Sequence, residues 1–228
     1  ALPTSARPPA PPPAWLSAPP REEPVPPRPL SPSSALAEEP GPGAADPERA
    51  RRARRRGTLI HRLLVTLPDL PATDRAGAGR RYLDTAARDL DGDARAALLD
   101  EALGVLETEG LAPLFAPGSR AEVPLAGVLA ELGGRVVSGT VDRLAVTDTQ
   151  VIVADYKTNR PPPLEVTDVP DAYAAQMAVY RAALKAIYPG REIACWLVWT
   201  WDARAMHLPD AVLDATLARL DTGAHRLA

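Results

Sequence analysis

The chain has 228 residues and a net charge of −3 at pH 7, which argues against a uniformly basic nucleic-acid binder. Its single cysteine, Cys195, excludes a disulfide framework and any iron–sulfur or zinc site made only of this chain's thiols. The sequence contains neither an apolar run of about 18 residues nor a signal-peptide pattern. We therefore expect a cytoplasmic protein with no membrane partner.

The N-terminal segment is rich in proline, since 16 of the 27 prolines lie in the first 50 residues. The run from Pro8 to Pro47 shows neither helical nor strand periodicity, so it cannot bury enough apolar surface to offset its ordering entropy. We predict a flexible, extended linker over residues 1–45 and one domain over residues 46–228. A Pro-rich ligand for a partner domain is the alternative interpretation of the linker.

A helical region follows the linker. Asp46 is placed as an N-cap and Pro47 as the first helical residue. Two further helices are expected over residues 73–90 and 93–109, with a break at Asp91-Gly92. The first helix carries one apolar stripe that we expect to face the core: Ile60, Leu63, Leu64 and Leu67.

Short β-type runs follow the helices, with a helix between the third and fourth runs and another at the C-terminus. We expect strands over 122–126, Arg135–Val146, 151–157 and 193–201, and helices over 169–187 and 209–220. Three strands that can pair as a meander, a crossover helix and a further strand predict an α/β fold with a mixed sheet. The chain has no G-x-x-x-x-G-K-[ST] phosphate loop, so it carries no ATPase of its own.

Two adjoining strands carry the residues that point to chemistry. A tight hairpin centred between Asp148 and Thr149 places Asp142 opposite Asp155. Like charges at directly opposed positions are destabilising unless they are compensated, and a divalent cation such as Mg²⁺ compensates them. Strand alternation places Lys157 on the same face as Asp155.

This group of residues fits phosphodiester hydrolysis. A metal can activate a bound water and neutralise charge on a phosphate, while a lysine orients that water or stabilises the transition state. The alternative is a surface ladder of Asp, Asp and Lys without a ligand. Residues 151–154 mark a buried strand, where an unexplained Asp and Lys would be costly. We therefore predict Asp142, Asp155 and Lys157 as catalytic residues.

His61 lies on the first helix, where a lone histidine is more often structural than a metal ligand. Gly57 lies one turn earlier on the same face. Since glycine inside a helix costs about 1 kcal/mol relative to alanine, close approach by another group is expected there. The residues alone leave both interpretations of His61 open.

Other polar residues allow two interpretations each. Tyr173, Gln176 and Tyr180 share one helix face, which either packs on the sheet or positions the DNA backbone or the lysine. Glu122 is either a further acidic contributor or a solvated strand residue. The basic run is either a solvated face or a phosphate contact, and consists of Arg51, Arg52, Arg54, Arg55 and Arg56.

The last apolar strand is expected to be mostly core, Cys195 included. Aromatic side chains can also stack on the bases of a single strand. Alternation places Trp199 and Trp201 on one face and Trp196 on the other, so at most part of this set can meet a base.

In this order and spacing, four short motifs resemble the RecB-like nucleases of the PD-(D/E)XK superfamily, most closely the C-terminal nuclease domain of AddA-type helicase–nuclease subunits. The motifs are Gly57-Thr-Leu-Ile-His61, Gly139-Thr-Val-Asp142-Arg143, Asp155-Tyr-Lys157-Thr-Asn-Arg160 and Gln176-Met-Ala-Val-Tyr180. Each motif is weak by itself. The resemblance implies a restriction-endonuclease-like fold that covers nearly everything after the linker.

The resemblance also implies roles for residues. His61, Asp142, Asp155 and the Tyr156 carbonyl would bind Mg²⁺, for which Mn²⁺ can substitute, and Lys157 would be the catalytic lysine. Gln176 and Tyr180 would form the QxxxY element, and with Arg143 they are predicted substrate contacts. Iron–sulfur branches of the family use four cysteines, so no iron–sulfur cluster is expected here.

The resemblance further implies a context. A helicase region of the same polypeptide would precede the linker, and the start at Ala1 without methionine fits an excised fragment. The domain would work with an AddB-type partner and act as an exonuclease on single-stranded DNA in double-strand-break repair and recombination. The alternative is a DNA-binding or docking module whose nuclease fold is inactive in isolation.

Overall fold

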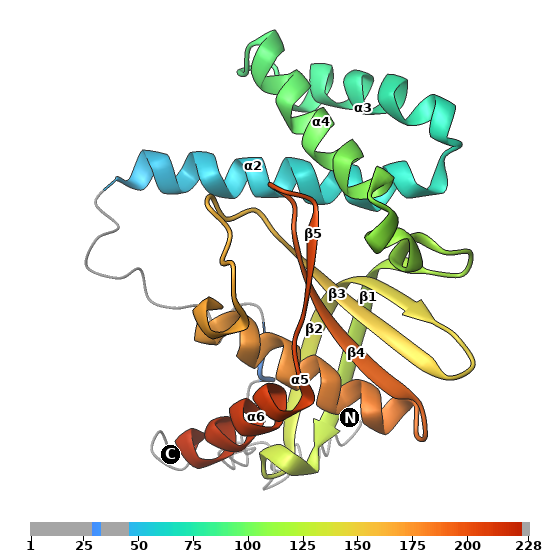
Figure 1. Cartoon of the computed structure of the whole chain (residues 1–228). Coiled ribbons are helices and arrows are strands. Elements are labelled where there is room, and N and C mark those ends of the chain that lie inside the picture. The colour runs from blue at the N-terminus through green and yellow to red at the C-terminus, as the bar shows by residue number, and fades with distance from the viewer. Residues whose placement is uncertain (1–28, 33–45, 225–228) are drawn as a thin grey trace, which may run out of the picture.

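The computed structural model describes residues 29–32 and 46–224 (Figure 1). Most of the predicted linker therefore lies outside the described residues, as do residues 225–228. Residues 29–32 form a short parallel bridge to the sheet: Leu30 N donates to Val136 O at 2.8 Å, and Ser138 N donates to Leu30 O at 3.0 Å. The sequence analysis did not predict this contact.

A mixed sheet of five strands forms the centre of the fold, in the order β1-β2-β3-β4-β5. Strands β3 and β4 are parallel, and the other neighbours are antiparallel. The strands are β1 (Arg120–Leu129), β2 (Arg135–Val146), β3 (Gln150–Lys157), β4 (Glu192–Trp199) and β5 (Arg204–His207). The predicted α/β class with a mixed sheet is confirmed. The predicted strand 193–201 was too long, because the chain turns after Trp199 into β5, which was not predicted.

Helices cover both faces of the sheet, as Figure 1 shows. One side carries α2 (Pro47–Thr66), α3 (Ala72–Ala86) and α4 (Gly92–Glu107), and the other carries α5 (Asp171–Ile187) and α6 (Asp210–Ala224). Short 3-10 helices lie at Leu67–Asp69, Glu109–Phe115, Ala130–Leu132 and Val166–Asp168. Each face has its own apolar core, because strand side chains alternate between them.

Helix α2 begins where the sequence predicts. The Asp46 carboxylate accepts hydrogen bonds from Glu48 N at 2.9 Å and Arg49 N at 3.2 Å, which satisfies two amides of the first turn. The predicted apolar stripe is buried: Ile60, Leu63, Leu64 and Leu67 are at most 2% exposed.

Glu101 of α4 joins α2 to the ends of two strands. Its buried carboxylate pairs with Arg56 of α2 and with Arg160 after β3, the latter at 2.5 Å. Thr200, just after β4, donates to the same carboxylate at 2.5 Å. Arg56 also donates to Thr158 O at 3.1 Å. Helix α2 is thereby held across the ends of β3 and β4.

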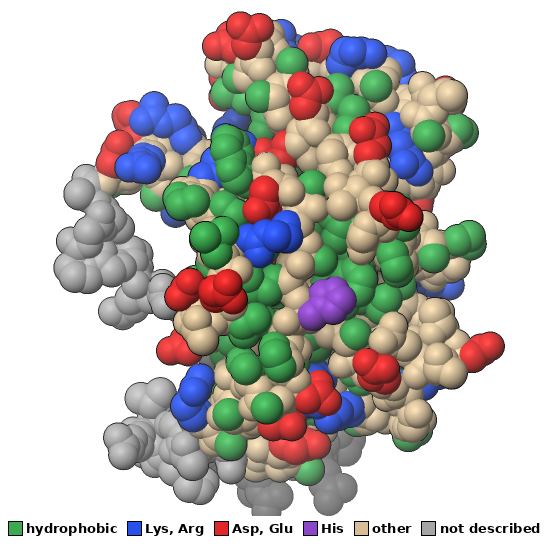
Figure 2. All heavy atoms as spheres, viewed as in Figure 1, with side chains coloured by type: hydrophobic (Ala, Val, Ile, Leu, Met, Phe, Trp, Pro, Cys, Tyr) green, Lys and Arg blue, Asp and Glu red, His purple; other side chains and the backbone are tan. Residues whose placement is uncertain are grey.

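The surface combines charged helices with scattered apolar side chains. On the face in Figure 2, charged side chains of both signs are scattered from top to bottom, and hydrophobic side chains lie between them over the middle. Within residues 29–32 and 46–224, the exposed large hydrophobic side chains are Val128, Val136, Val146, Leu164, Ile187 and Trp201. Among the described residues, no helix has the length and apolar character needed to span a bilayer.

Packing between α3 and α4 gives a test of the fold. A Cβ at Gly79 would lie 2.3 Å from Leu99 Cδ1, whereas one at Gly104 would meet nothing within 4 Å. Gly79→Val should therefore lower the free energy of unfolding by about 1–3 kcal/mol through overpacking. Gly104→Ala should raise it by about 1 kcal/mol. Urea denaturation measures both variants, and equal effects would contradict the packing described for α3.

Candidate active site

The candidate site lies where β2 and β3 separate. Their pairing runs from Val146–Val151 to Arg143–Ala154, which is the register predicted from the sequence. Asp142 and Asp155 follow directly after the last pair. Instead of continuing the ladder, the Asp142 carboxylate accepts a hydrogen bond from Tyr156 N at 2.8 Å. The Asp142 side chain therefore lies in the fork between the two strands.

Asp155, Lys157 and Gln176 form a closed hydrogen-bonded triangle at this fork. The Lys157 ammonium lies 2.6 Å from Asp155 Oδ2 and donates to Gln176 Oε1 at 2.9 Å. Gln176 Nε2 donates to Asp155 Oδ1 at 2.7 Å. Asp155 is 3% exposed, and a buried carboxylate is costly unless it is paired. The Lys157 charge and the Gln176 amide provide this pairing. Asp155 and Lys157 share a face, as strand alternation predicts.

The shared helix face predicted for Tyr173, Gln176 and Tyr180 points into the protein. Gln176 and Tyr173 on this face contact Lys157. The Lys157 ammonium lies 4.0 Å from the centroid of the Tyr173 ring. Tyr180 is fully buried and donates to Thr140 O at 2.7 Å. The structure therefore supports positioning of the lysine by Gln176 and Tyr173, and packing by Tyr180. It does not support the prediction that Gln176 and Tyr180 contact DNA, because both are buried.

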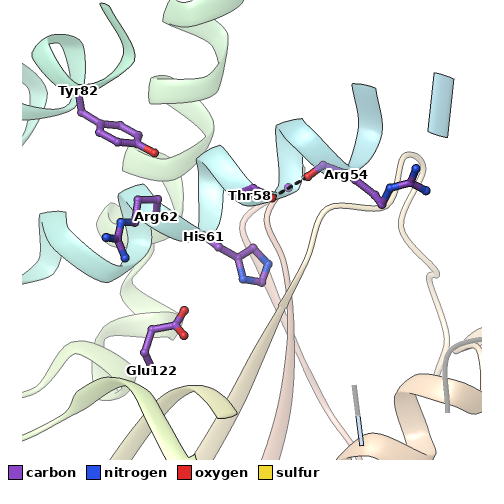
Figure 3. A pocket seen from close by; sticks show the side chains of 7 residues that line it. Arg54, Thr58, His61, Arg62, Tyr82 and Glu122 are labelled. Atoms are coloured by element: carbon purple, nitrogen blue, oxygen red, sulfur yellow. Dashed lines mark hydrogen bonds between the residues drawn. The ribbon is translucent and has the colours of Figure 1, made fainter. Parts of the chain in front are cut away.

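His61 reaches the fork from α2, on the opposite side from α5 (Figure 3). Its Nδ1 lies 3.4 Å from Asp142 Oδ1, and its Nε2 lies 3.0 Å from the Tyr156 carbonyl oxygen. The ring also makes an edge contact with the Tyr156 ring, at a centroid distance of 5.7 Å. The structure thus brings together His61, Asp142 and the Tyr156 carbonyl.

The charges at the fork influence one another. Burial raises the pKa of Asp155, the Lys157 charge opposes this, and the nearby Asp142 charge adds to it, so the net direction is upward. Burial lowers the pKa of His61, but the hydrogen bond and charge of Asp142, with the charge of Asp155, exceed that effect and raise it. Both carboxylates therefore act electrostatically on the imidazole.

Gly57 allows a close approach within the protein. A Cβ there would lie 3.3 Å from Thr158 Oγ1, so the glycine lets α2 approach the loop after β3. The close approach predicted at Gly57 is thus explained by a neighbouring loop. The approach of α2 at Gly57 brings His61, which lies one turn later on the helix, beside Asp142.

Glu122 has a strained backbone beside the same site. Its φ is 50°, in the left-handed region that non-glycine residues seldom adopt, although it lies within β1. Its exposed side chain lines a hollow together with His61, and Figure 3 shows the two pointing toward the same space. Strain of this kind concentrates at functional sites, which favours the interpretation of Glu122 as an acidic contributor.

Arg143 is placed differently from its prediction. It is 2% exposed, donates to Leu114 O at 3.1 Å and to Ser119 Oγ at 2.6 Å, and lies over the Phe115 ring. All of these partners belong to the segment before β1. The structure therefore does not support a substrate contact for Arg143, since its guanidinium is buried and bonded within the protein.

The tryptophans and the cysteine are mostly core, as predicted. Trp196, Trp199 and Cys195 are at most 6% exposed. Trp201 lies beyond β4, is 52% exposed, and has the Arg160 guanidinium 3.9 Å from its ring centroid. Only Trp201 of these three tryptophans has an accessible ring.

The donor set at the fork fits a hard divalent cation. It contains two carboxylates and a main-chain carbonyl, which are oxygen ligands of the type used by Mg²⁺ and Mn²⁺, together with one imidazole nitrogen. Each carboxylate oxygen has two lone pairs, so the bonds to Asp142 and Asp155 leave further acceptor positions. Within residues 29–32 and 46–224, no three His, Cys, Asp or Glu side chains form a ready metal-binding cluster. The two carboxylates have different partners, His61 for Asp142 and Lys157 for Asp155.

Some residues around the site were not predicted. Arg62, Tyr82 and Thr58 line the hollow beside His61, and Glu101 holds α2 in place. Arg62 directly follows His61 in the sequence, which could have drawn attention to it. Tyr82 and Glu101 lie on other helices, and no local pattern identifies them.

The fold is a mixed sheet covered by helices, with an Asp-x-Lys strand beside a second aspartate at a strand fork. The chain belongs to the PD-(D/E)XK nuclease superfamily, whose family model matches residues 36–214. This match supports the restriction-endonuclease-like fold. A search of curated proteins found no match.

Two solved structures are similar at low identity. One is named "Putative exonuclease", from Eubacterium rectale; it has 16% identity and a TM-score of 0.43, and the match covers 68% of this chain and 63% of that chain. The other is SSO0001, with 17% identity and a TM-score of 0.32, covering 75% of this chain and 85% of that chain. The chain thus spans less than two thirds of the Eubacterium rectale protein.

Gln176 gives a test of the site. Gln176→Leu removes both bonds that hold Lys157 and Asp155 in place, each to a charged group. Cleavage of DNA should slow by about 10- to 100-fold in kcat with little change in KM, since the amide is buried away from substrate. Tyr180→Phe is the control, because it removes the bond to Thr140 O and the long contact from Gln176 Nε2 at 3.4 Å but leaves the bonds of Gln176 to Lys157 and Asp155. Equal losses of kcat in the two variants, at equal unfolding stability, would show that Gln176 acts only through packing.

Proposed function

We propose that this chain is the nuclease domain of an AddA-type helicase–nuclease subunit, a Mg²⁺-dependent exonuclease that hydrolyses single-stranded DNA during double-strand-break repair and recombination. The superfamily match supports the nuclease class. The observation that carries the proposal is the arrangement of His61, Asp142, Asp155 and Lys157 around one strand fork. Mn²⁺ can substitute for Mg²⁺ in such an oxygen-rich site.

The residues that would hold the cation are His61, Asp142, Asp155 and the Tyr156 carbonyl, with Glu122 as a further acidic candidate. When bound, a divalent cation would activate water and neutralise charge on the scissile phosphate. The protein contributes the position of each ligand: α2 brings His61 to one side of the fork, and the Tyr156 amide fixes Asp142.

Lys157 would act on the phosphate and on the attacking water. Its ammonium is held by Asp155, Gln176 and the Tyr173 ring, so it loses little further freedom when a substrate binds. A fixed positive charge beside a phosphate stabilises the negative charge that grows in the transition state. The neighbouring carboxylate keeps this lysine within the site.

The proposed context comes from the family resemblance. A helicase region of the same polypeptide would supply the single strand, and an AddB-type subunit would be the partner.

Lys157 can be tested against a matched control, because the chain has one other lysine, Lys185. Lys157→Ala should reduce cleavage of a labelled single strand by about 100- to 1000-fold in Mg²⁺ or Mn²⁺, through loss of a preorganised charge. Asp155→Ala should abolish measurable cleavage. Lys185→Ala is the control, since Lys185 is exposed in the last turn of α5. Wild-type rates in the Lys157 and Asp155 variants would reject the proposed function.

One observation favours a second function, a DNA-binding or docking module that is inactive in isolation. The Asp155 carboxylate is bonded to Lys157 and Gln176. Calorimetric titration with Mn²⁺, followed by incubation with single strand, separates the two functions. Metal binding together with cleavage supports the nuclease. Metal binding without cleavage, restored by adding the helicase region, supports the module.

A further inference from the structure

A hollow of about 640 Å³ lies beside the candidate metal ligands, between α2, α3 and β1 (Figure 3). This volume is within the usual range of ligand sites. Its lining residues are Arg54, Gly57, Thr58, His61, Arg62, Tyr82 and Glu122. Since His61 belongs both to this hollow and to the fork, a substrate bound at the fork has the hollow as its adjoining surface.

Two arginines of α2 flank His61 along the helix, one on each side in Figure 3. Arg54 and Arg62 are eight positions apart, which corresponds to about 12 Å along a helix axis. In the part of the chain that the structure describes, neither guanidinium has an acidic or hydrogen-bonding partner. The arginines of the other flank do have acidic partners, in the pairs Arg52–Asp46, Arg55–Asp89 and Arg56–Glu101.

Those two charges matter because the fork itself is acidic. Asp142, Asp155 and Glu122 repel the phosphates of a nucleic acid. The positive charge of Lys157 beside them is already bonded to Asp155. A polyanion that approaches His61 therefore needs cations on either side. Arg54 and Arg62 occupy those positions.

Tyr82 adds an aromatic surface to the same hollow. It comes from α3, is half-buried, and points toward α2 in Figure 3. A ring that is packed on one side and open on the other can stack on an unpaired base, a contact that does not depend on base identity. In a duplex the bases are already stacked and paired, so such a contact favours a single strand.

We propose that single-stranded DNA lies along α2 through this hollow, with Arg54 and Arg62 binding phosphates on either side of the one at His61, and with Tyr82 stacking on a base. The inference rests on the proposed function, because it describes how the same site holds its substrate. The path would favour single strand over duplex, which the metal ligands alone would not do.

The test is binding of a fluorescent single strand to the full chain in EDTA, measured by anisotropy over a salt series. Arg54→Gln and Arg62→Gln should each weaken binding by about five- to tenfold and make the slope of log K against log salt shallower by about 0.7. Arg52→Gln removes the same charge from the other flank of α2 and should leave that slope unchanged. Tyr82→Ala should weaken binding by about 5- to 100-fold, whereas Tyr82→Phe should retain it.

Three results would overturn the proposed path: no binding of single strand by the wild type, equal effects of Arg52→Gln and Arg54→Gln, or unchanged affinity in Tyr82→Ala. Equal affinity for a duplex of the same sequence would also contradict it. The assay contains no metal, so it is independent of cleavage. A wild type that binds in the predicted pattern but does not cut with Mg²⁺ or Mn²⁺ would contradict the proposed nuclease while supporting the path.

Discussion

The separation of β2 and β3 after the Arg143–Ala154 pair is the constraint on which the site depends. If the ladder continued, Asp142 and Asp155 would be directly opposed inside a sheet that is covered on both faces, where like charges are destabilising. Because the strands part, Asp142 can turn to the Tyr156 amide and to His61, and Asp155 can turn to Lys157 and Gln176. Side chains from both helical layers thus meet at one opening in the sheet.

The position of α2 is the second requirement. The helix contributes His61 and the arginines of the hollow, but it belongs to a separate core from α5. The buried Glu101 carboxylate ties it to the ends of β3 and β4 through Arg56, Arg160 and Thr200. Breaking a buried pair of this kind leaves uncompensated charge, so this contact constrains α2 strongly. The absence of a side chain at Gly57 then lets the helix approach the loop after β3.

Much of the fold follows from local sequence signals. The Asp46 cap, the apolar stripe of α2, the bounds of Arg135–Val146 and the hairpin register were all predictable, because capping and strand alternation act between near neighbours. Strand β5 was not predicted, since four residues without an apolar alternation give too little signal.

The site was predictable to a lesser degree, and for a different reason. Asp155 and Lys157 share a strand, so alternation places them together, and Gln176 contacts them from a helix whose face could be read from spacing. The burial of Arg143 depends on Leu114 and Ser119, and the hollow depends on Tyr82 of α3. Such contacts between distant segments are set by tertiary packing, which one sequence does not reveal by itself.

The central claim is that His61, Asp142 and Asp155 share one divalent cation at this fork. Crystals soaked in Mn²⁺ and measured at a wavelength where manganese scatters anomalously test it directly. The account predicts one anomalous peak within about 2.5 Å of both carboxylates, with the imidazole of His61 as a further ligand. A peak elsewhere, or two carboxylates that keep their separate partners at saturating Mn²⁺, would contradict it.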